Sequence, residues 1–244
     1  MSAQEVAVNG WTAVPVDAGK LFDGKPFKNI PQSVLVADIE WPSEDPIVTK
    51  VQQYVKDKLP LPTFNHSMRV FYYSTAIMRQ QFPEHLANFS SSTLALTALL
   101  HDIGTAQENL SATHMSFEFY GGIKALNLLL QLGSTKDQAE AVCETIIRHQ
   151  DLGTLGNITF LGQVIQLATI YDNVSNHPSV PNIKDIIHIK TLEDVVKAFP
   201  RLGWLGCFAK TIQEEVRLKP WCHSTHIPDF DKMILANEVM KPYE

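Results

Sequence analysis

Four ionisable side chains of this 244-residue chain lie in or at the end of strongly apolar, helix-periodic segments. They are His66, the adjacent pair His101 and Asp102, and Asp172. A polar or charged group in an apolar interior is costly unless it finds a partner. Because one divalent cation would be a partner for all four, their types and spacing predict a metal centre and a metal-dependent enzyme.

Four segments place such a residue on the same helical face as apolar neighbours. The neighbours recur at separations of about three, four and seven residues, the spacing of one helix face. The sets are His66, Val70, Tyr73 and Ile77; Leu94, Ala98 and His101; Val142, Ile146 and His149; and Leu161, Ile165, Ala168 and Asp172. Four helices are therefore expected to direct imidazole or carboxylate groups into one apolar interior.

A shared cation is not the only way to satisfy such groups. A buried histidine is more often a satisfied core residue than a ligand, and an inward aspartate can bond to backbone amides or to an arginine. Few basic residues lie on these faces, however, which favours one shared partner. Two imidazoles and two carboxylates suit zinc, iron or manganese better than calcium. We therefore expect Zn²⁺, with Fe²⁺ as the alternative, and one coordination position open for water or substrate.

The rest of the sequence predicts an all-α fold that positions these groups. Residues 1–45 are expected to form an irregular N-terminal arm with one short strand at 33–36, residues 46–177 the metal-binding helical domain, and residues 178–244 a C-terminal helical extension packed on it. Ser43 or Asp45 is expected to cap the first helix, and a buried strand is the alternative for 94–100. Helices are predicted near 46–58, 63–82, 91–103, 113–132, 135–150, 158–175, 191–198, 203–218 and 228–238.

Charge and cysteine content exclude several classes of function. The formal net charge is −6 without a clustered basic stripe, which disfavours binding to nucleic acid. The three cysteines are widely spaced and predict neither a disulfide framework nor a zinc knuckle, as is usual in a reducing compartment. The N-terminus does not resemble a secretory signal, and no apolar stretch is long enough to span a bilayer. We therefore expect a cytoplasmic protein that does not bind a membrane.

The order of the candidate ligands, a His, a His-Asp pair in ALTALLHDIGT and a later Asp, resembles the metal-binding signature of the HD-domain superfamily. That resemblance implies an HD-domain helical bundle with His66, His101, Asp102 and Asp172 as metal ligands. A narrower resemblance, to the fungal cyanamide hydratase family, covers about residues 62–226 and rests on FNHSMRVFYYSTAI, MSFEFYGG, IIRHQDLG, YDNV, FPRLGWLGCFA and KPWCHSTH. It implies a hydro-lyase that uses zinc to add water to cyanamide, a small neutral nitrile, giving urea.

The mechanism expected for such an enzyme needs a nucleophile and a source of protons. We hypothesise that metal-bound hydroxide attacks the nitrile carbon, with Asp102 catalytic as a ligand. His149 is the first candidate proton donor, because it faces the same interior and titrates near neutrality; orienting a ligand or binding a second metal are the alternatives. Glu118 in MSFEFYGG is the second candidate, with an exposed helix carboxylate as the alternative.

The first alternative function is an HD-type phosphohydrolase acting on a nucleotide. Many HD phosphohydrolases carry a lysine three residues after the HD aspartate, where it can meet a phosphate. This chain has Thr105 at that position, which suits a neutral substrate, although Arg148 or Lys124 could substitute. The second alternative is a catalytically silent, metal-stabilised binding protein, in which no coordination position is open.

Other histidines and one apolar segment are assigned structural roles. His223 and His226 in CHSTH are expected in a surface loop or packing tail, without partners elsewhere, and His177 and His188 are expected to be exposed. The apolar segment 202–208 is expected to pack over the bundle or to meet a second subunit. Because exposed apolar patches favour association, a homo-oligomer is expected.

Overall fold

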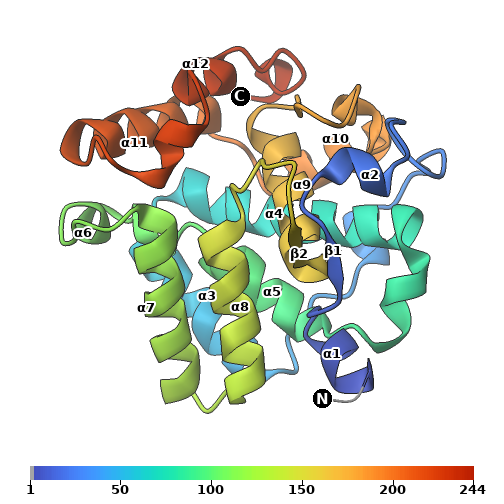
Figure 1. Cartoon of the computed structure of the whole chain (residues 1–244), viewed down its shortest axis with the longest axis horizontal. Helices are drawn as coiled ribbons and strands as arrows, with labels where there is room; N and C mark the ends of the chain where they lie inside the picture. The colour runs from blue at the N-terminus through green and yellow to red at the C-terminus, as the bar shows by residue number, and fades with distance from the viewer. Residues whose placement is uncertain (1–2) are drawn as a thin grey trace.

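The computed structural model describes residues 3–244 and consists largely of helices (Figure 1). This confirms the predicted all-α class. The helices are α1 (Ala3–Val8), α2 (Ala18–Leu21), α3 (Pro46–Lys58), α4 (Leu61–Gln81), α5 (Ser91–Leu100), α6 (Gln107–Leu110), α7 (Phe117–Gln131), α8 (Lys136–Arg148), α9 (Phe160–Asn173), α10 (Ile189–Ala198), α11 (Trp204–Leu218) and α12 (Phe230–Leu235).

The predicted helices from residue 46 onward are all present, with bounds that differ by a few residues. Asp45 caps α3, since its carboxylate accepts a hydrogen bond from the Ile47 amide at 2.8 Å, and Pro46 fills the first turn. The run 94–100 is helical rather than a strand. Helix α5 ends at Leu100, three residues earlier than predicted, and a 3₁₀ turn follows at Ile103–Thr105. His101 and Asp102 lie between the two.

The N-terminal arm is more ordered than expected, and the predicted strand at 33–36 is wrong. Residues 33–35 have no regular structure, and Val36–Asp38 form a 3₁₀ turn. Instead, β1 (Ala13–Pro15) pairs antiparallel with β2 (Asn157–Thr159). Because this pairing is short and joins segments far apart in the sequence, it leaves no local alternation to detect. It fixes the arm to the start of α9, the helix that carries Asp172.

Helix α4 lies at the centre of the molecule and is buried along most of its length. Helices α5 and α9 pack against it, and α10 and α11 contact it from the C-terminal part of the chain. In Figure 1, α11 and α12 form the upper layer above α4, whereas α7 and α8 pair at the lower left. A helix covered by others on several sides can be apolar nearly all round, so a polar residue such as His66 on α4 faces the interior.

The apolar segment 202–208 packs over the bundle, with Trp204 and Phe208 buried. The predicted exposure of His177 is wrong: this side chain is 6% exposed, and its Nδ1 accepts a hydrogen bond from the Ser179 amide. His188 is half-buried and caps α10 by accepting from the Lys190 amide. Tertiary packing, which local polarity does not reveal, produces both differences.

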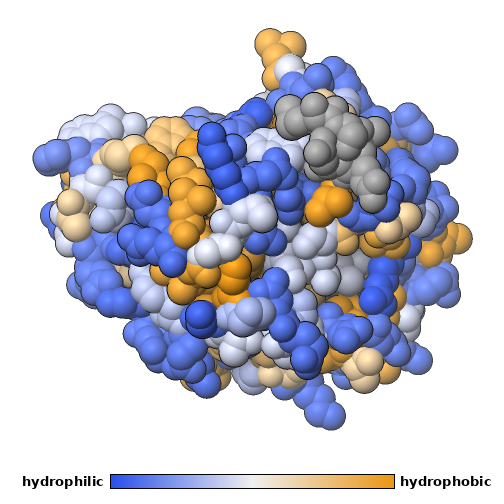
Figure 2. Space-filling view, turned by 90° about the horizontal axis from the view of Figure 1, so that it is seen from below, coloured by the Kyte–Doolittle hydropathy of each residue, from blue (hydrophilic) through white to orange (hydrophobic). Residues whose placement is uncertain are grey.

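The surface carries some apolar side chains. Figure 2 shows apolar groups among mostly hydrophilic residues on the face seen from below. Exposed apolar residues of the chain include Ile123 and Leu130 on α7. Apolar surface favours association, and the homo-oligomer stays a prediction. Within residues 3–244, every helix is too short or too polar to cross a bilayer.

Candidate metal centre

Three ligand-type side chains converge in the interior. His66 Nε2 lies 3.1 Å from His101 Nε2 and 3.7 Å from Asp102 Oδ2, and His101 Nε2 lies 3.3 Å from the same oxygen. All three side chains are at most 1% exposed. Tetrahedral zinc bonds of about 2.0–2.2 Å place neighbouring ligand atoms about 3.3–3.6 Å apart. The three donors therefore have the spacing of a shared ion.

Local structure explains how the chain brings His101 and Asp102 there. His101 ends α5, and its amide still donates to the Thr97 carbonyl. The chain then leaves the helix at Asp102 and turns toward α7 through Gly104. A Cβ at Gly104 would lie 2.0 Å from the Phe117 carbonyl oxygen, so only glycine permits this close approach. The HDIG sequence is thus a tight turn that packs on the start of α7.

Three histidines have their tautomers set by fixed acceptors. His66 Nδ1 donates to Asp172 Oδ2 at 2.6 Å, His101 Nδ1 to the Ala98 carbonyl at 2.8 Å, and His149 Nδ1 to the Ile146 carbonyl at 2.7 Å. In a neutral imidazole whose Nδ1 carries the proton, Nε2 has a free lone pair. The Nε2 lone pairs of His66 and His101 then face each other, which a cation between them would stabilise.

Asp102 is buried and ionised. Burial raises its pKa, but the neighbouring His101 outweighs this effect and lowers the pKa to about 2. Neither carboxylate oxygen accepts a hydrogen bond from any of residues 3–244. An ionised carboxylate without hydrogen bonds in the interior is costly, and a metal ion would supply the missing partner. The donor set of this structure therefore fits a divalent cation.

The histidines differ in their protonation. Burial lowers the pKa of both His66 and His149 to about 4, so both are neutral at pH 7, as metal ligands must be. Burial acts in the same direction on His101, but the Asp102 carboxylate prevails and raises its pKa. The expectation that His149 titrates near neutrality is wrong. Its position agrees with the prediction, however, since Nε2 lies 4.0 Å from Asp102 Oδ1.

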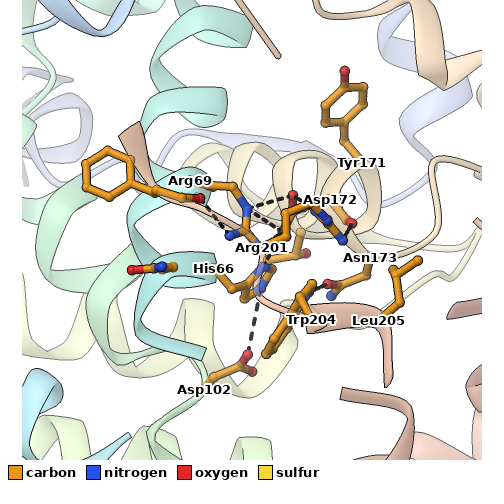
Figure 3. Close-up of polar contacts among 12 residues, drawn as sticks. His66, Arg69, Asp102, Tyr171, Asp172, Asn173, Arg201, Trp204 and Leu205 are labelled. Atoms are coloured by element: carbon orange, nitrogen blue, oxygen red, sulfur yellow. Dashed lines mark hydrogen bonds and ion pairs between the residues drawn. The ribbon is translucent and has the colours of Figure 1, made fainter. Parts of the chain in front are cut away.

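Asp172 lies on the other side of the His66 ring (Figure 3). Its carboxylate accepts hydrogen bonds from Arg69 Nη2 at 2.8 Å and from Arg201 Nη1 at 2.5 Å, besides the bond from His66 Nδ1. Burial raises the pKa of Asp172, but Arg201 and Arg69 outweigh it and hold the pKa well below the usual value. Asp172 thus contacts His66 Nδ1, the ring nitrogen that faces away from His101 and Asp102. Its predicted role as a ligand stays a prediction.

Comparison with known proteins identifies the family. An HD domain matches at residues 63–174, a span that contains His66, His101, Asp102 and Asp172. Cyanamide hydratases DDI2 and DDI3 of Saccharomyces cerevisiae are each 41% identical to this chain over 230 residues, which cover 93% of this chain and 96% of the relative. The chain belongs to the cyanamide hydratase family of HD-domain proteins. Both resemblances inferred from the sequence are confirmed.

Two arginines near the metal centre of this family member were not among the residues singled out in the sequence. They satisfy Asp172, which the expectation of one shared cation as the partner of all four groups did not include. Arg69 lies three residues after His66 on α4, so helical spacing alone could have placed it nearby. Arg201 lies in the connection between α10 and α11, and no local pattern links it to Asp172.

Two aromatic side chains that cover the metal centre, here called the aromatic wall, were also not singled out in the sequence: Trp204 and Phe208. The Trp204 ring stacks on the His66 ring with centroids 4.3 Å apart, and Phe208 stacks on Trp204 at 5.0 Å. Trp204 Nε1 donates to Asn173 Oδ1 at 2.7 Å, which fixes the indole. The segment GWLGCF at the start of α11 therefore covers the metal centre.

Glu118 is buried rather than exposed, and its partner is His223. Glu118 Oε1 lies 3.3 Å from His223 Nδ1, and Asp151 Oδ1 lies 3.3 Å from His223 Nε2. Asp151 and Glu118 together raise the pKa of His223 to about 9, whereas burial raises the pKa of Glu118. The expectation that His223 has no partners elsewhere is wrong. The catalytic role of Glu118 stays a prediction.

Proposed function

We propose that this protein is a zinc-dependent cyanamide hydratase, which adds water to cyanamide to give urea. One observation carries the proposal: a buried carboxylate without hydrogen bonds, Asp102, lies beside the Nε2 atoms of His66 and His101. Two imidazoles and a carboxylate are a donor set that zinc accepts, with Fe²⁺ as the alternative. The relatives named cyanamide hydratase support the choice of substrate.

His66, His101 and Asp102 would hold the ion. Zinc bound there would act as a Lewis acid and would lower the pKa of a bound water toward neutrality. Asp172 accepts the Nδ1 proton of His66 and so fixes the orientation of the ring. Carboxylates that act on a ligand histidine in this way increase its basicity and the metal affinity of the site. This proposal gives Asp172 the role of positioning a ligand, in place of the direct ligand role that the resemblance implies, and the two arginines keep Asp172 in place.

His149 would carry the proton. Its Nδ1 is committed to the Ile146 carbonyl, so the Nε2 lone pair, 4.0 Å from Asp102, is free to accept a proton from the attacking water. The oxygen of that water bonds to the nitrile carbon while one C–N π bond breaks. His149 Nε2 then returns the proton to the nitrile nitrogen. The product, isourea, tautomerises to urea, and no electrons are exchanged with a redox partner.

The surroundings of the centre suit a neutral substrate. Thr105 occupies the position of the phosphate-binding lysine, and its hydroxyl donates to the Asp102 carbonyl at 2.7 Å. Trp204 and Phe208 stack over His66 and shield that side of the site from water. Low solvent access strengthens electrostatic interactions with a developing charge. A substrate that brings several negative charges gains little from this arrangement.

The experiment that tests the proposal is a parallel assay of urea release from cyanamide and phosphate release from nucleotides. Purified protein, with its bound metals measured by mass spectrometry, is expected to release urea in proportion to its zinc content and to leave nucleotides intact. The Asp102→Asn variant serves as the control for contaminating activity. Phosphate release without urea release would favour the phosphohydrolase, and bound zinc without either product would overturn the assignment as an enzyme.

A further inference from the structure

The metal centre is enclosed, so a substrate needs a route to it. The four side chains closest to the proposed chemistry are at most 2% exposed: His66, His101, Asp102 and His149. Cyanamide has three non-hydrogen atoms in a nearly straight line, so a narrow route is sufficient. The surface of the protein has hollows in several places, and one of them can be linked to the centre residue by residue.

This hollow lies between α6, α11 and the residue before α4. Its volume is about 270 Å³, and its lining includes Pro60, Thr105, Gln107, Leu110, Lys210 and Thr211. In Figure 1, α6 lies below α11 at the left edge of the molecule, on the side where α4 begins. Besides α6, the hollow is thus bordered by three segments that also build the metal centre: the start of α4, the end of the HDIG turn at Thr105, and α11.

Each of these segments connects the hollow to the centre within one or two helical turns. Pro60, the residue before α4, borders the hollow. On α4, Thr63 is buried one turn further, and His66 follows after another turn, about 9 Å along the axis from Pro60. In the HDIG turn, Thr105 borders the hollow, and its hydroxyl donates to the backbone of Asp102.

The third segment is α11. Lys210 and Thr211 border the hollow, and Cys207 and Phe208 lie one turn earlier on the same helix. Thr211 Oγ1 donates to the Cys207 carbonyl at 3.1 Å, which ties the two turns together. Phe208 stacks on Trp204, which stacks on His66.

Helices α4 and α11 contact each other, and each carries a residue one turn inward from the hollow. Thr63 lies one turn beyond Pro60 on the way to His66, and Cys207 lies one turn before Thr211 and next to Phe208. Burial and the Asp102 carboxylate raise the pKa of the Cys207 thiol, and Thr63 acts against this rise, which agrees with this placement. The thiol is half-buried, whereas Thr63 and Asp102 are buried. Cys207 thus stands between the hollow and the donors.

We propose that this hollow is the outer mouth of the substrate route and that Cys207 and Thr63 form its constriction, which admits small rod-like molecules and excludes wider ones. The proposal rests on the proposed function for the identity of the substrate. The route itself is tested separately with azide, a linear three-atom ion that changes the visible spectrum of a cobalt-loaded centre when it binds.

The experiment narrows the route at Cys207 by reversible disulfide formation with methyl and benzyl methanethiosulfonates. The Cys143→Ser protein keeps Cys207, and the matched Cys207→Ser protein keeps Cys143, a half-buried thiol on α8 whose pKa burial also raises. Both proteins keep Cys222, which is buried. Treated and untreated samples of each protein are compared, with the modification measured by mass spectrometry. Modification of Cys207 is expected to lower both kcat/KM for cyanamide and the affinity for azide about tenfold or more. The benzyl group is expected to have a larger effect than the methyl group because it is wider. A reductant restores both.

Each result has a distinct meaning. Fully modified Cys207 with kcat/KM and azide binding unchanged would overturn the route. Azide binding that falls on modification, in a protein that makes no urea even untreated, would support the route and overturn the proposed function. If the thiol resists the reagents, Thr211→Trp replaces them, with Gln213→Trp on the exposed side of α11 as control. Thr211→Trp is expected to lower kcat/KM about fivefold with its metal content unchanged, and equal values for the two variants would overturn the route.

Discussion

Asp102 and Asp172 are both fully buried carboxylates within reach of His66, yet their surroundings are opposite. Asp172 is neutralised by the protein itself, through two arginines and an imidazole N–H. Asp102 has no hydrogen-bond partner among residues 3–244 and depends on neighbouring imidazoles for its low pKa. The difference teaches that burial alone does not identify a ligand: the carboxylate that the protein leaves unsatisfied is the one available to a metal.

The largest effect is expected from Asp102→Asn. Loss of a charged donor should remove the metal and lower urea release at least about a thousandfold. In the metal-free protein the same change removes a buried charge that only imidazoles stabilise, so the free energy of unfolding should fall by less than it does for Asp172→Asn. Metal content, urea release and urea denaturation of the metal-free protein check these outcomes. Wild-type activity in the variant would contradict the role of Asp102.

His149→Ala tests whether His149, which lies on the Asp102 side of His66, carries a proton or binds the metal. Loss of proton transfer is expected to lower kcat by about 10² to 10⁴, while the metal content stays at the wild-type level. Steady-state kinetics and metal analysis of the same sample decide the matter. If the metal is lost together with the activity, His149 is a ligand and the proposed proton carrier is wrong.

Asp172→Asn is expected to act on stability more than on the chemical step. It leaves Arg69 and Arg201 buried without their shared anion, which should cost about 3 to 5 kcal/mol of unfolding free energy. The weaker acceptor for His66 Nδ1 should lower metal affinity about 10- to 100-fold. Denaturation of the metal-free protein and a metal titration measure the two effects. If Asp172→Asn is as stable as Asp102→Asn, the two carboxylates do not differ in how far the protein itself stabilises them.

The smallest effect concerns a third arrangement, in which His223 is held between Asp151 and Glu118. Its pKa of about 9 in the folded protein exceeds that of an unfolded histidine, about 6.5. A raised pKa stabilises the folded state below the unfolded value, and this stabilisation is lost as the pH rises from about 6.5 through 9. His223→Gln should therefore cost about 1 to 2 kcal/mol at pH 6, allowing for partial exposure, and much less at pH 9.5.

Urea denaturation of the wild type and of His223→Gln at both pH values measures this difference. If His223→Gln lowers the free energy of unfolding equally at pH 6 and pH 9.5, the imidazolium charge does not contribute to stability. His188→Gln is a suitable control, since His188 caps α10 in a half-buried position away from these acids.

Sequence periodicity was sufficient to predict the helical bundle and the meeting of His66, His101 and Asp102. The apolar faces of α4 and α5 carry that information, and the HDIG turn explains the position of Asp102. The surroundings of Asp172 could not be predicted in the same way. Arg201 reaches it from a connection far along the chain, so only tertiary structure brings the two together.

Other differences have the same physical origin. The strands β1 and β2 are each three residues long and pair across most of the chain, so their sequences contain too little alternation to be recognised. His223 follows a segment that resembles a surface loop, but it docks on the start of α7 through Glu118. Contacts of this kind depend on how elements pack, and local residue types do not report packing.

The central claim, that an ion held by His66, His101 and Asp102 performs the hydration, is tested most directly by a zinc titration of the metal-stripped protein. Urea release from cyanamide is expected to be absent at the start, to rise linearly with added zinc, and to level off at about one ion per chain. Full activity in the stripped protein, or saturation with zinc without urea release, would contradict the account.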